Sequence, residues 1–315
     1  MRLPVAVWLL VMACGSSSDE PITISFVEPA LGASFARDEL GPSGAVSAMV
    51  PFEVAISGAP TRIALSAGAR AFDLESNAGL IDVRELGPLT LTATAYDGED
   101  IVATAEIDVE ITDLALATCR DWLDAFEIEY TAGPAMPGVV DPVTAKVPIN
   151  GVAYKAVGAM SPRTKLFGDC RLIKSLVRAA PALRERDVTQ VTDYGVYNYR
   201  CIGGGTPPNC PNGISQHAYA MAIDLAGFTT SDGAYASVND DWVIDPNSEK
   251  TCNAPAEVGP DAFLHELICA LKAAKVWNIV LTPNYNADHR NHFHVDLTPG
   301  SDFIERRDAT VVYGD

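Results

Sequence analysis

The sequence has few basic residues and few histidines. Only 22 of the 315 residues are lysine or arginine, against 41 aspartates and glutamates, and the formal net charge is −19. Phosphate binding depends on lysine and arginine, so this balance disfavours nucleic acids and other polyanions as partners. The chain also lacks a GxGxxG motif and a P-loop. With 48% hydrophobic residues, it is instead expected to fold into globular domains with cores of their own.

The N-terminal apolar run, Leu3–Ala13, is too short to span a bilayer, which takes roughly 20 apolar residues. It follows the cationic Arg2 and stops at Cys14, and this is the pattern of an export signal. The sequence "LVMAC" resembles the lipobox of bacterial lipoproteins, whereas an ordinary signal peptide with an incidental cysteine is the alternative. Residues 1–20 are therefore predicted to be a lipoprotein signal peptide and tether. Lipidated at Cys14, the protein would be exported and anchored to a membrane, facing the periplasm or cell envelope.

No CxxC pair occurs, and none of the six cysteines other than Cys14 has zinc-finger spacing, so a cysteine metal site is not expected. An even number of cysteines in an exported chain predicts disulfides, with 15 possible full pairings. Cys201 and Cys210 bracket the turn-rich "IGGGTPPN" and are the favoured pair. The six cysteines other than Cys14 are Cys119, Cys170, Cys201, Cys210, Cys252 and Cys269.

Residues 21–112 have no cysteine and almost no helix signal. Short runs such as "ITISFV" and "IVATAEIDVEIT" alternate apolar and polar residues with a period of two, which indicates strands. In Leu89–Tyr96 this alternation is followed by Asp97-Gly98, a hairpin turn signal. About seven such runs predict an all-β immunoglobulin-like sandwich, acting as a spacer or binding module.

Residues 113–315 contain all five histidines and are expected to hold the function. Two stretches, 170–186 and 261–277, have apolar residues at helical spacing. The segments "VTDYGVYNYRC", "AYAMAIDLAGF" and "NHFHVDL" indicate strands, without regular βαβ alternation. The predicted fold is an α+β catalytic domain with a mainly antiparallel sheet and flanking helices.

The histidines concentrate in "ADHRNHFHVDL", residues 287–297. On a strand, His292, His294 and Asp296 share one face, and the residues between them share the other. In "AMAIDLAG", Asp224 lies on one face with small alanines. If the two strands pair, Asp224 and the histidines converge, and His217 arrives from the preceding loop. Two imidazoles and a carboxylate suit one Zn²⁺ ion and leave a position open for a water nucleophile.

"SQHAYAMAID" resembles the S-x-H-x-x-G-x-A-x-D motif of the zinc peptidases that act on peptidoglycan peptides, including D-alanyl-D-alanine carboxypeptidases and murein endopeptidases. This resemblance implies that His217, Asp224 and His294 are zinc ligands and that His292 is catalytic. A longer stretch, roughly 115–300, resembles the extensin-like C-terminal domain, which is related to these peptidases. One position departs from the motif: Ala220 stands where the motif has glycine.

The candidate substrate-binding residues are Arg200, Ser215 and His289. By the same resemblance, Arg200 would hold a substrate carboxylate, although a surface arginine is an equal alternative. Ser215 is more simply explained as a residue that fixes the loop before His217. Asp296 is a candidate to orient one of the imidazoles, or a residue that caps the strand end.

The predicted function is zinc-dependent hydrolysis of amide bonds in peptidoglycan peptides, of murein endopeptidase or D,D-carboxypeptidase type. The alternative is a non-catalytic, zinc-containing cell-wall-binding module on a lipoprotein. His292 distinguishes the two, because a site that only holds metal does not require it. A scaffold in which the histidines are incidental predicts no stoichiometric metal.

Overall fold

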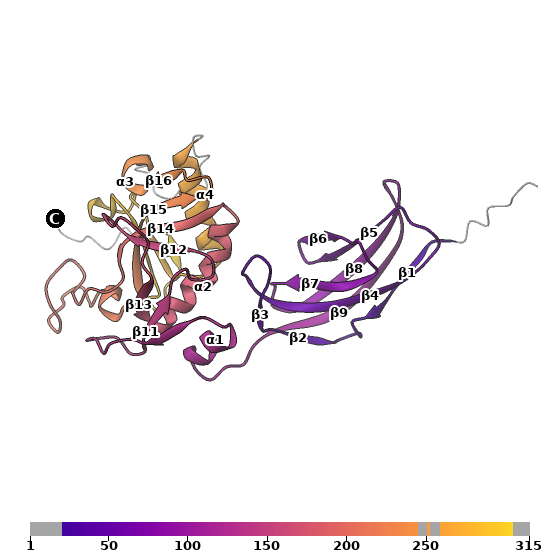
Figure 1. Cartoon of the computed structure of the whole chain (residues 1–315), viewed down its shortest axis with the longest axis horizontal. Helices are drawn as coiled ribbons and strands as arrows, with labels where there is room; N and C mark the ends of the chain where they lie inside the picture. The colour runs from indigo at the N-terminus through magenta and orange to yellow at the C-terminus, as the bar shows by residue number, and fades with distance from the viewer. Residues whose placement is uncertain (1–20, 245–250, 253–258, 305–315) are drawn as a thin grey trace, which may run out of the picture. The chain divides into compact units, whose positions relative to one another are not determined.

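The structure, a computed structural model, describes residues 21–244, 251–252 and 259–304 (Figure 1). The chain forms two compact units: within the described residues, the first comprises residues 21–35 and 49–112, and the second comprises residues 36–48 and those from 113 onward. The predicted signal peptide and its Cys14 lie outside the described residues. Within the described ranges, no helix has both the length and the apolar character needed to cross a membrane.

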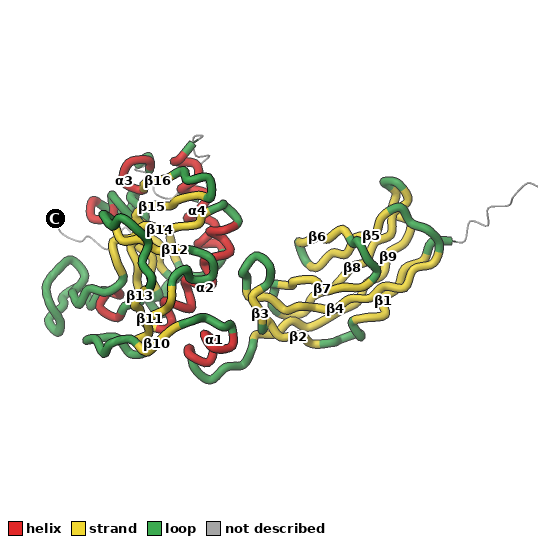
Figure 2. Tube along the Cα trace, in the orientation of Figure 1, coloured by secondary structure: helices red, strands yellow, loops and turns green. Residues whose placement is uncertain are grey.

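The strands up to residue 113 form two sheets, seen as yellow segments in Figure 2. A four-stranded sheet has the order β1-β4-β3 with β7 also paired to β4, and a five-stranded sheet has the order β2-β9-β8-β5-β6. The strands are β1 (Thr23–Glu28), β2 (Ser34–Arg37), β3 (Glu39–Leu40), β4 (Val46–Ser57), β5 (Arg62–Ala67), β6 (Arg70–Asp73), β7 (Ala78–Val83), β8 (Gly87–Asp97) and β9 (Asp100–Asp113).

The β8–β9 hairpin shows how the sequence specifies these sheets. Leu91, Ala93 and Ala95 of β8 are fully buried, and the residues between them are not, as the period of two predicts. β8 pairs antiparallel with β9, and Gly98 takes a positive φ of 63° in the turn between them. The predicted hairpin at Asp97-Gly98 is therefore confirmed.

The second unit contains a three-stranded sheet, β10-β11-β13, and a seven-stranded sheet of order β12-β14-β15-β18-β17-β19 with β16 paired to β15. Its first elements are α1 (Cys119–Ala125), β10 (Tyr130–Ala132), β11 (Pro142–Lys146), β12 (Ala153–Ala156), β13 (Lys165–Asp169), α2 (Cys170–Arg184) and β14 (Val188–Gly195). Its later elements are the 3-10 helix η1 (Gln216–Tyr219), β15 (Ala222–Thr230), β16 (Tyr235–Ser237), α3 (Val238–Asp241), α4 (Pro260–Ala273), β17 (Ile279–Leu281), the 3-10 helix η3 (Ala287–His289), β18 (Phe293–Asp296) and β19 (Phe303–Ile304).

Both helices predicted from helical spacing are present as α2 and α4. Asp169 caps α2 by accepting a hydrogen bond from the backbone N–H of Arg171. In α4, Pro260 occupies the first turn, where a missing N–H costs nothing. Each helix buries its apolar stripe in the core of the second unit: Leu172, Ile173, Leu176 and Val177 in α2, and Leu264, Leu267, Ile268 and Leu271 in α4.

The prediction of a helix-flanked α+β catalytic domain is wrong. Strands account for 42% of the protein and helices for 17%, so it is mostly β-sheet, in several sheets with few helices. The two long helices have a clear 3.6-residue period in the sequence. In contrast, β10 to β13 are only three to five residues long, too short for a period of two to show. β-Sandwich parts are present.

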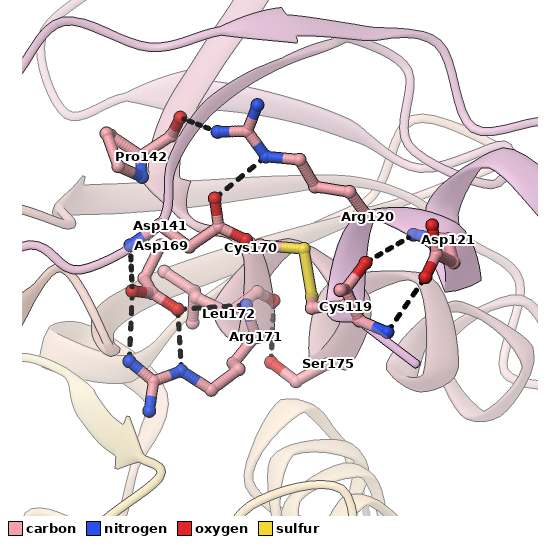
Figure 3. The surroundings of a disulfide bond; sticks show 11 residues. Cys119, Arg120, Asp121, Asp141, Pro142, Asp169, Cys170, Arg171, Leu172 and Ser175 are labelled. Carbon is pink, nitrogen blue, oxygen red and sulfur yellow. Dashed lines mark hydrogen bonds and ion pairs between the residues drawn. A yellow bond between two sulfur atoms is a disulfide. The ribbon is translucent and has the colours of Figure 1, made fainter. Parts of the chain in front are cut away.

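Three disulfides link the six cysteines of the second unit: Cys119–Cys170, Cys201–Cys210 and Cys252–Cys269. The predicted Cys201–Cys210 bond is confirmed. Figure 3 shows that the Cys119–Cys170 bond joins α1 to the start of α2. Beside it the Asp169 carboxylate is fully buried and accepts two hydrogen bonds from the guanidinium of Arg171, at 2.7 and 3.0 Å.

Candidate metal centre

Two strands of the seven-stranded sheet bring Asp224 and His294 together. β15 and β18 pair antiparallel, and Asp224 lies directly opposite His294 in the register. Residues opposite one another on the same face have Cβ atoms about 4.5–5.5 Å apart. The alternate residues Ile223 and Val295 are fully buried in the core on the other face. The strand pairing expected from the sequence is thus present, with one polar face and one apolar face.

His217 reaches the same place from η1, the 3-10 helix just before β15. Ser215 begins this helix, and its hydroxyl accepts a hydrogen bond from the backbone N–H of His217. Ala220 ends it in the left-handed conformation, with φ 52° and ψ 34°. The turn therefore needs the backbone geometry that glycine adopts freely and alanine adopts at a cost of about 1 kcal/mol.

The three side chains form a compact triangle. Asp224 Oδ1 lies 3.1 Å from His217 Nε2 and 2.9 Å from His294 Nδ1, and the two imidazole nitrogens are 3.2 Å apart. His217 and His294 are buried, whereas the Asp224 side chain keeps 17% of its surface exposed. One side of the triangle is thus open to solvent through Asp224.

The other nitrogen of each imidazole has its own partner. His217 Nδ1 lies 2.8 Å from the carbonyl oxygen of Val196, which fixes the proton on Nδ1 and leaves Nε2 with a lone pair. His294 Nε2 lies 3.0 Å from the buried carboxylate of Asp296, so this nitrogen is the donor. In both rings the nitrogen inside the triangle is the one that is available to a cation. Such outer partners are typical of metal-binding histidines.

Electrostatics in the triangle favour a bound cation. Burial alone would raise the pKa of Asp224, but hydrogen bonds and charge from His217 and His294 hold it well below its usual range. Burial alone would lower the pKa of His294, but Asp224 and Asp296 outweigh burial and raise it to about 9. At neutral pH the triangle without a metal therefore keeps a proton on His294, which a metal ion would displace.

The donor set fits a zinc ion. Ligands about 2.0–2.2 Å from one zinc at tetrahedral angles lie roughly 3.3–3.6 Å from each other, close to the distances in the triangle. Two imidazoles and one carboxylate match the preference of zinc for nitrogen and oxygen donors, and three protein ligands leave a fourth position open.

His292 and His289 stand beside the triangle. His292 Nε2 lies 3.4 Å from Asp224 Oδ1, and its Nδ1 lies 2.8 Å from the side-chain oxygen of Asn291. Burial lowers the pKa of His292, although Asp224 raises it. Burial and the neighbouring His294 lower the pKa of His289 to about 3. Both imidazoles are therefore neutral at pH 7.

The predicted substrate-binding residues occupy different surroundings. Arg200 is half-buried, and its positive charge contributes to the lowered pKa values of His289 and His292 less than burial and the nearer charged groups do. Ser215 is only 5% exposed, and it fixes the loop before His217. His289 contacts the rings of His292 and His294, with centroids 5.2 and 5.8 Å away.

Several neighbours of the centre were not predicted from the sequence. Val196 contributes a backbone carbonyl, which no side-chain pattern reveals. Asn291 positions His292 and donates its amide to the hydroxyl of Tyr194 at 3.0 Å, and the Tyr194 ring meets that of His292 edge-on at 5.8 Å. The adjacency of Asn291 to His292 was the only available signal.

His265 lies apart from this cluster. Its ring stacks on Trp242 with centroids 3.9 Å apart, and Nδ1 lies 2.9 Å from the Thr251 carbonyl oxygen. These contacts give His265 a structural role.

A second group of ligand-type side chains in the described part of the chain consists of Cys119, Asp141 and Cys170. The two sulfurs are joined in the disulfide of Figure 3, and Asp141 pairs with Arg120 at 2.7 Å. With its sulfurs bonded to each other and its carboxylate paired, this group has no thiolate to offer a metal.

Residues 118–303, more than half of the chain, match the family model described as the extensin-like protein C-terminus. The chain belongs to this extensin-like C-terminal family. The matched segment contains the whole candidate centre and all three disulfides. No curated protein matches the chain.

Solved structures resemble this extensin-like chain only weakly. The fibronectin(III)-like modules of Clostridium thermocellum CbhA are 6% identical, covering 29% of this chain and 99% of that one, with a TM-score of 0.22. Apo Bacteroides uniformis beta-glucuronidase 3 is 14% identical, and the match covers 42% of this chain and 15% of that chain, with a TM-score of 0.22. The Bacteroides ovatus SGBP-B, solved with a mixed-linkage heptasaccharide, is 10% identical. The match covers 71% of this chain and 49% of that chain, with a TM-score of 0.21.

Proposed function

We propose that the protein is a zinc-dependent hydrolase of amide bonds in peptidoglycan peptides, acting at the cell envelope. The observation that carries this proposal is the triangle of His217, Asp224 and His294, in which every nitrogen that faces inward is free of another partner. His292, neutral and 3.4 Å from Asp224, is the additional group that a site for holding metal alone would not need. The motif resemblance supplies the substrate class.

A zinc ion held by these three residues would lower the pKa of a bound water to about 7 and polarise the scissile carbonyl. His292 moves the proton. Its Nδ1–H donates to Asn291, so the lone pair is on Nε2, which faces the triangle. As water attacks the amide carbon, Nε2 takes up the released proton and then delivers it to the nitrogen that leaves as the amine.

The substrate has to be anchored by groups other than the triangle. Arg200 is the candidate to bind a substrate carboxylate, because a guanidinium pairs with a carboxylate through two parallel hydrogen bonds. Its positive charge lowers the pKa of both His289 and His292, which supports this assignment. A membrane anchor at Cys14 would keep the enzyme at the envelope where peptidoglycan lies.

The test uses purified protein, elemental analysis and murein sacculi. Wild type is expected to contain one zinc per chain and to change the chromatogram of digested sacculi. His292→Ala is expected to keep its zinc and to lose about 10²–10⁴-fold of the rate, the usual contribution of a general acid–base. A zinc-loaded wild type that leaves every muropeptide peak unchanged would favour a non-catalytic wall-binding module. A folded chain without zinc would count against both.

The anchor is tested separately by Cys14→Ser in the full-length precursor. Loss of membrane association is expected, and unchanged association would contradict lipidation at this cysteine.

A further inference from the structure

An open pocket of about 470 Å³ lies beside the candidate metal centre. Ala226 lines it and stands two residues after Asp224, on the same face of β15. Tyr194 and Asn291 also line it, and both contact His292. Tyr194 and Asn291 thus connect the pocket to His292 of the centre. A substrate bound at the centre would reach the pocket with its next side chain.

The pocket contains a lysine with no internal counter-charge. Lys155 lies on β12 directly opposite Thr192 of β14, and the preceding Tyr154 is buried on the other face of the sheet. Lys155 and Thr192 both line the pocket. Across residues 21–244, 251–252 and 259–304, no carboxylate is within ion-pair distance of Lys155. The Lys155 ammonium is therefore free to pair with an anion from outside the chain.

The only carboxylate in the lining, Asp240, lies on α3. Its side chain accepts hydrogen bonds from the hydroxyl of Ser237 at 2.8 Å and from the amide of Asn239 at 2.7 Å. These hydrogen bonds hold the Asp240 side chain in place, and the residue is exposed. The lining therefore offers one positive and one negative group, which together suit a ligand end that carries both an ammonium and a carboxylate.

Two tyrosines give the pocket apolar flanks. Tyr194 and Tyr235 are 48% and 50% exposed, and both line the pocket. The Tyr235 hydroxyl lies over Gly227, where an added Cβ would come within 2.2 Å of it. A glycine at this point of β15 thus lets the ring lie close to the sheet. Aromatic rings in such positions pack against an aliphatic stem while their hydroxyls stay in water.

Another part of the lining is held by a backbone hydrogen bond and a nearby ion pair. Val157 and Gly158 line the pocket, and the backbone N–H of Val157 donates to the carbonyl of Asp193 at 2.9 Å. The Asp193 carboxylate is fully buried and pairs with Arg163, which follows Val157 by six residues in the same loop. The pocket is therefore formed before a ligand arrives, which reduces the entropy lost on binding.

We propose that this pocket binds a substrate side chain that has an aliphatic stem and ends in an amino group beside a carboxylate, with Lys155 binding the carboxylate. The inference rests on the proposed function and names the substrate class of that site. Among stem peptides, a 2,6-diaminopimelate residue has such a side chain. A lysine residue has the same kind of stem and the amino group but lacks the carboxylate, so it offers Lys155 no partner.

Binding and hydrolysis of two matched pentapeptides, L-Ala-γ-D-Glu-X-D-Ala-D-Ala with X either meso-diaminopimelate or L-lysine, test this pocket. Binding is measured by calorimetry on the metal-depleted full chain, where hydrolysis does not interfere. The wild type is expected to bind the diaminopimelate peptide about tenfold more tightly, and Lys155→Met to lose this preference. Lys155→Arg is expected to keep it, as is Lys165→Met, a control on the three-stranded sheet.

Equal binding of the two peptides, binding of neither, or an unchanged preference in a folded Lys155→Met overturns the pocket assignment. Hydrolysis by the zinc-loaded chain is scored separately. If the diaminopimelate preference depends on Lys155 but neither peptide is cleaved, the pocket stands and the proposed hydrolysis fails. If both peptides are cleaved at equal rates and bound equally, the hydrolase stands and the pocket assignment fails.

Discussion

Two groups of ligand-type side chains lie in the described part of the second unit, and their chemistry differs. The inward-facing nitrogens of His217 and His294 contact only members of their own group, whereas the sulfurs of Cys119 and Cys170 are bonded to each other. Both groups bring three donor atoms within 4.8 Å of one another. Proximity alone therefore does not make a metal site, and the partners of the remaining atoms decide the outcome.

The largest effect is expected from removing one donor of the triangle. Asp224→Asn keeps the shape of the side chain and removes its charge. Zinc affinity should fall by more than about a hundredfold, since residues that merely orient ligands already contribute 10–100-fold. Elemental analysis after dialysis against a chelator measures this. Asp141→Asn is the matched control from the disulfide group and should retain zinc; equal zinc in both variants would contradict the contrast between the groups.

Breaking the second group should instead affect stability. The Cys119–Cys170 bond closes a loop with a sequence separation of 51, and removing both cysteines as Cys119→Ser with Cys170→Ser should cost about 4 kcal/mol of unfolding free energy. The Cys201–Cys210 bond, with a separation of 9, should cost about 2.5 kcal/mol. Denaturant titration measures both. A folded Cys119 and Cys170 double variant that has lost its zinc would show that the groups are not independent.

The metal-free protein should become less stable as pH rises. The pKa of His294 in the folded state, about 9, lies above the unfolded value of roughly 6.5. This stabilisation is therefore complete below about pH 6.5 and is lost as pH rises to about 9, by an amount on the order of 3 kcal/mol. Thermal unfolding at several pH values with excess chelator measures it. The zinc-loaded protein should not show this decline, because the metal replaces the proton.

The smallest effect is expected at Ala220. Ala220→Gly relieves about 1 kcal/mol of left-handed strain at φ 52°. It also removes a fully buried methyl group, worth about 0.8 kcal/mol, and adds freedom to the unfolded chain. These terms oppose each other, so the net change in unfolding free energy should stay within about 1 kcal/mol, with zinc content unchanged. A change above about 2 kcal/mol in thermal unfolding would show that one of these terms has been misjudged.

Much of the candidate centre follows from the sequence because strand geometry is simple. The period of two assigns Asp224 to one face of β15 and places His294 and Asp296 together on β18, and the structure has them so. The prediction held that His292 shares this strand, but β18 begins at Phe293, and His292 approaches from the turn before it.

The sequence could not show the rest, because it depends on contacts between distant backbone segments. The Val196 carbonyl that orients His217 comes from a different part of the chain. Every residue has a backbone carbonyl, so the residue type at position 196 does not reveal this contact. The pocket around Lys155 draws on β12, β14, β15, β16 and α3, so it exists only once these are paired. The short strands β10 to β13 carry too little periodicity for the sequence to predict a mostly β architecture.

The register of β15 against β18 has a consequence for folding fidelity. Side chains alternate between the faces of a sheet, so pairing shifted by one residue would place the core residues Ile223 or Val295 where Asp224 and His294 now meet. Such a chain would keep much of its backbone hydrogen bonding and still lack the donor triangle. Capture of a metal ion by newly folded protein would therefore report on whether these two strands have found their correct partners.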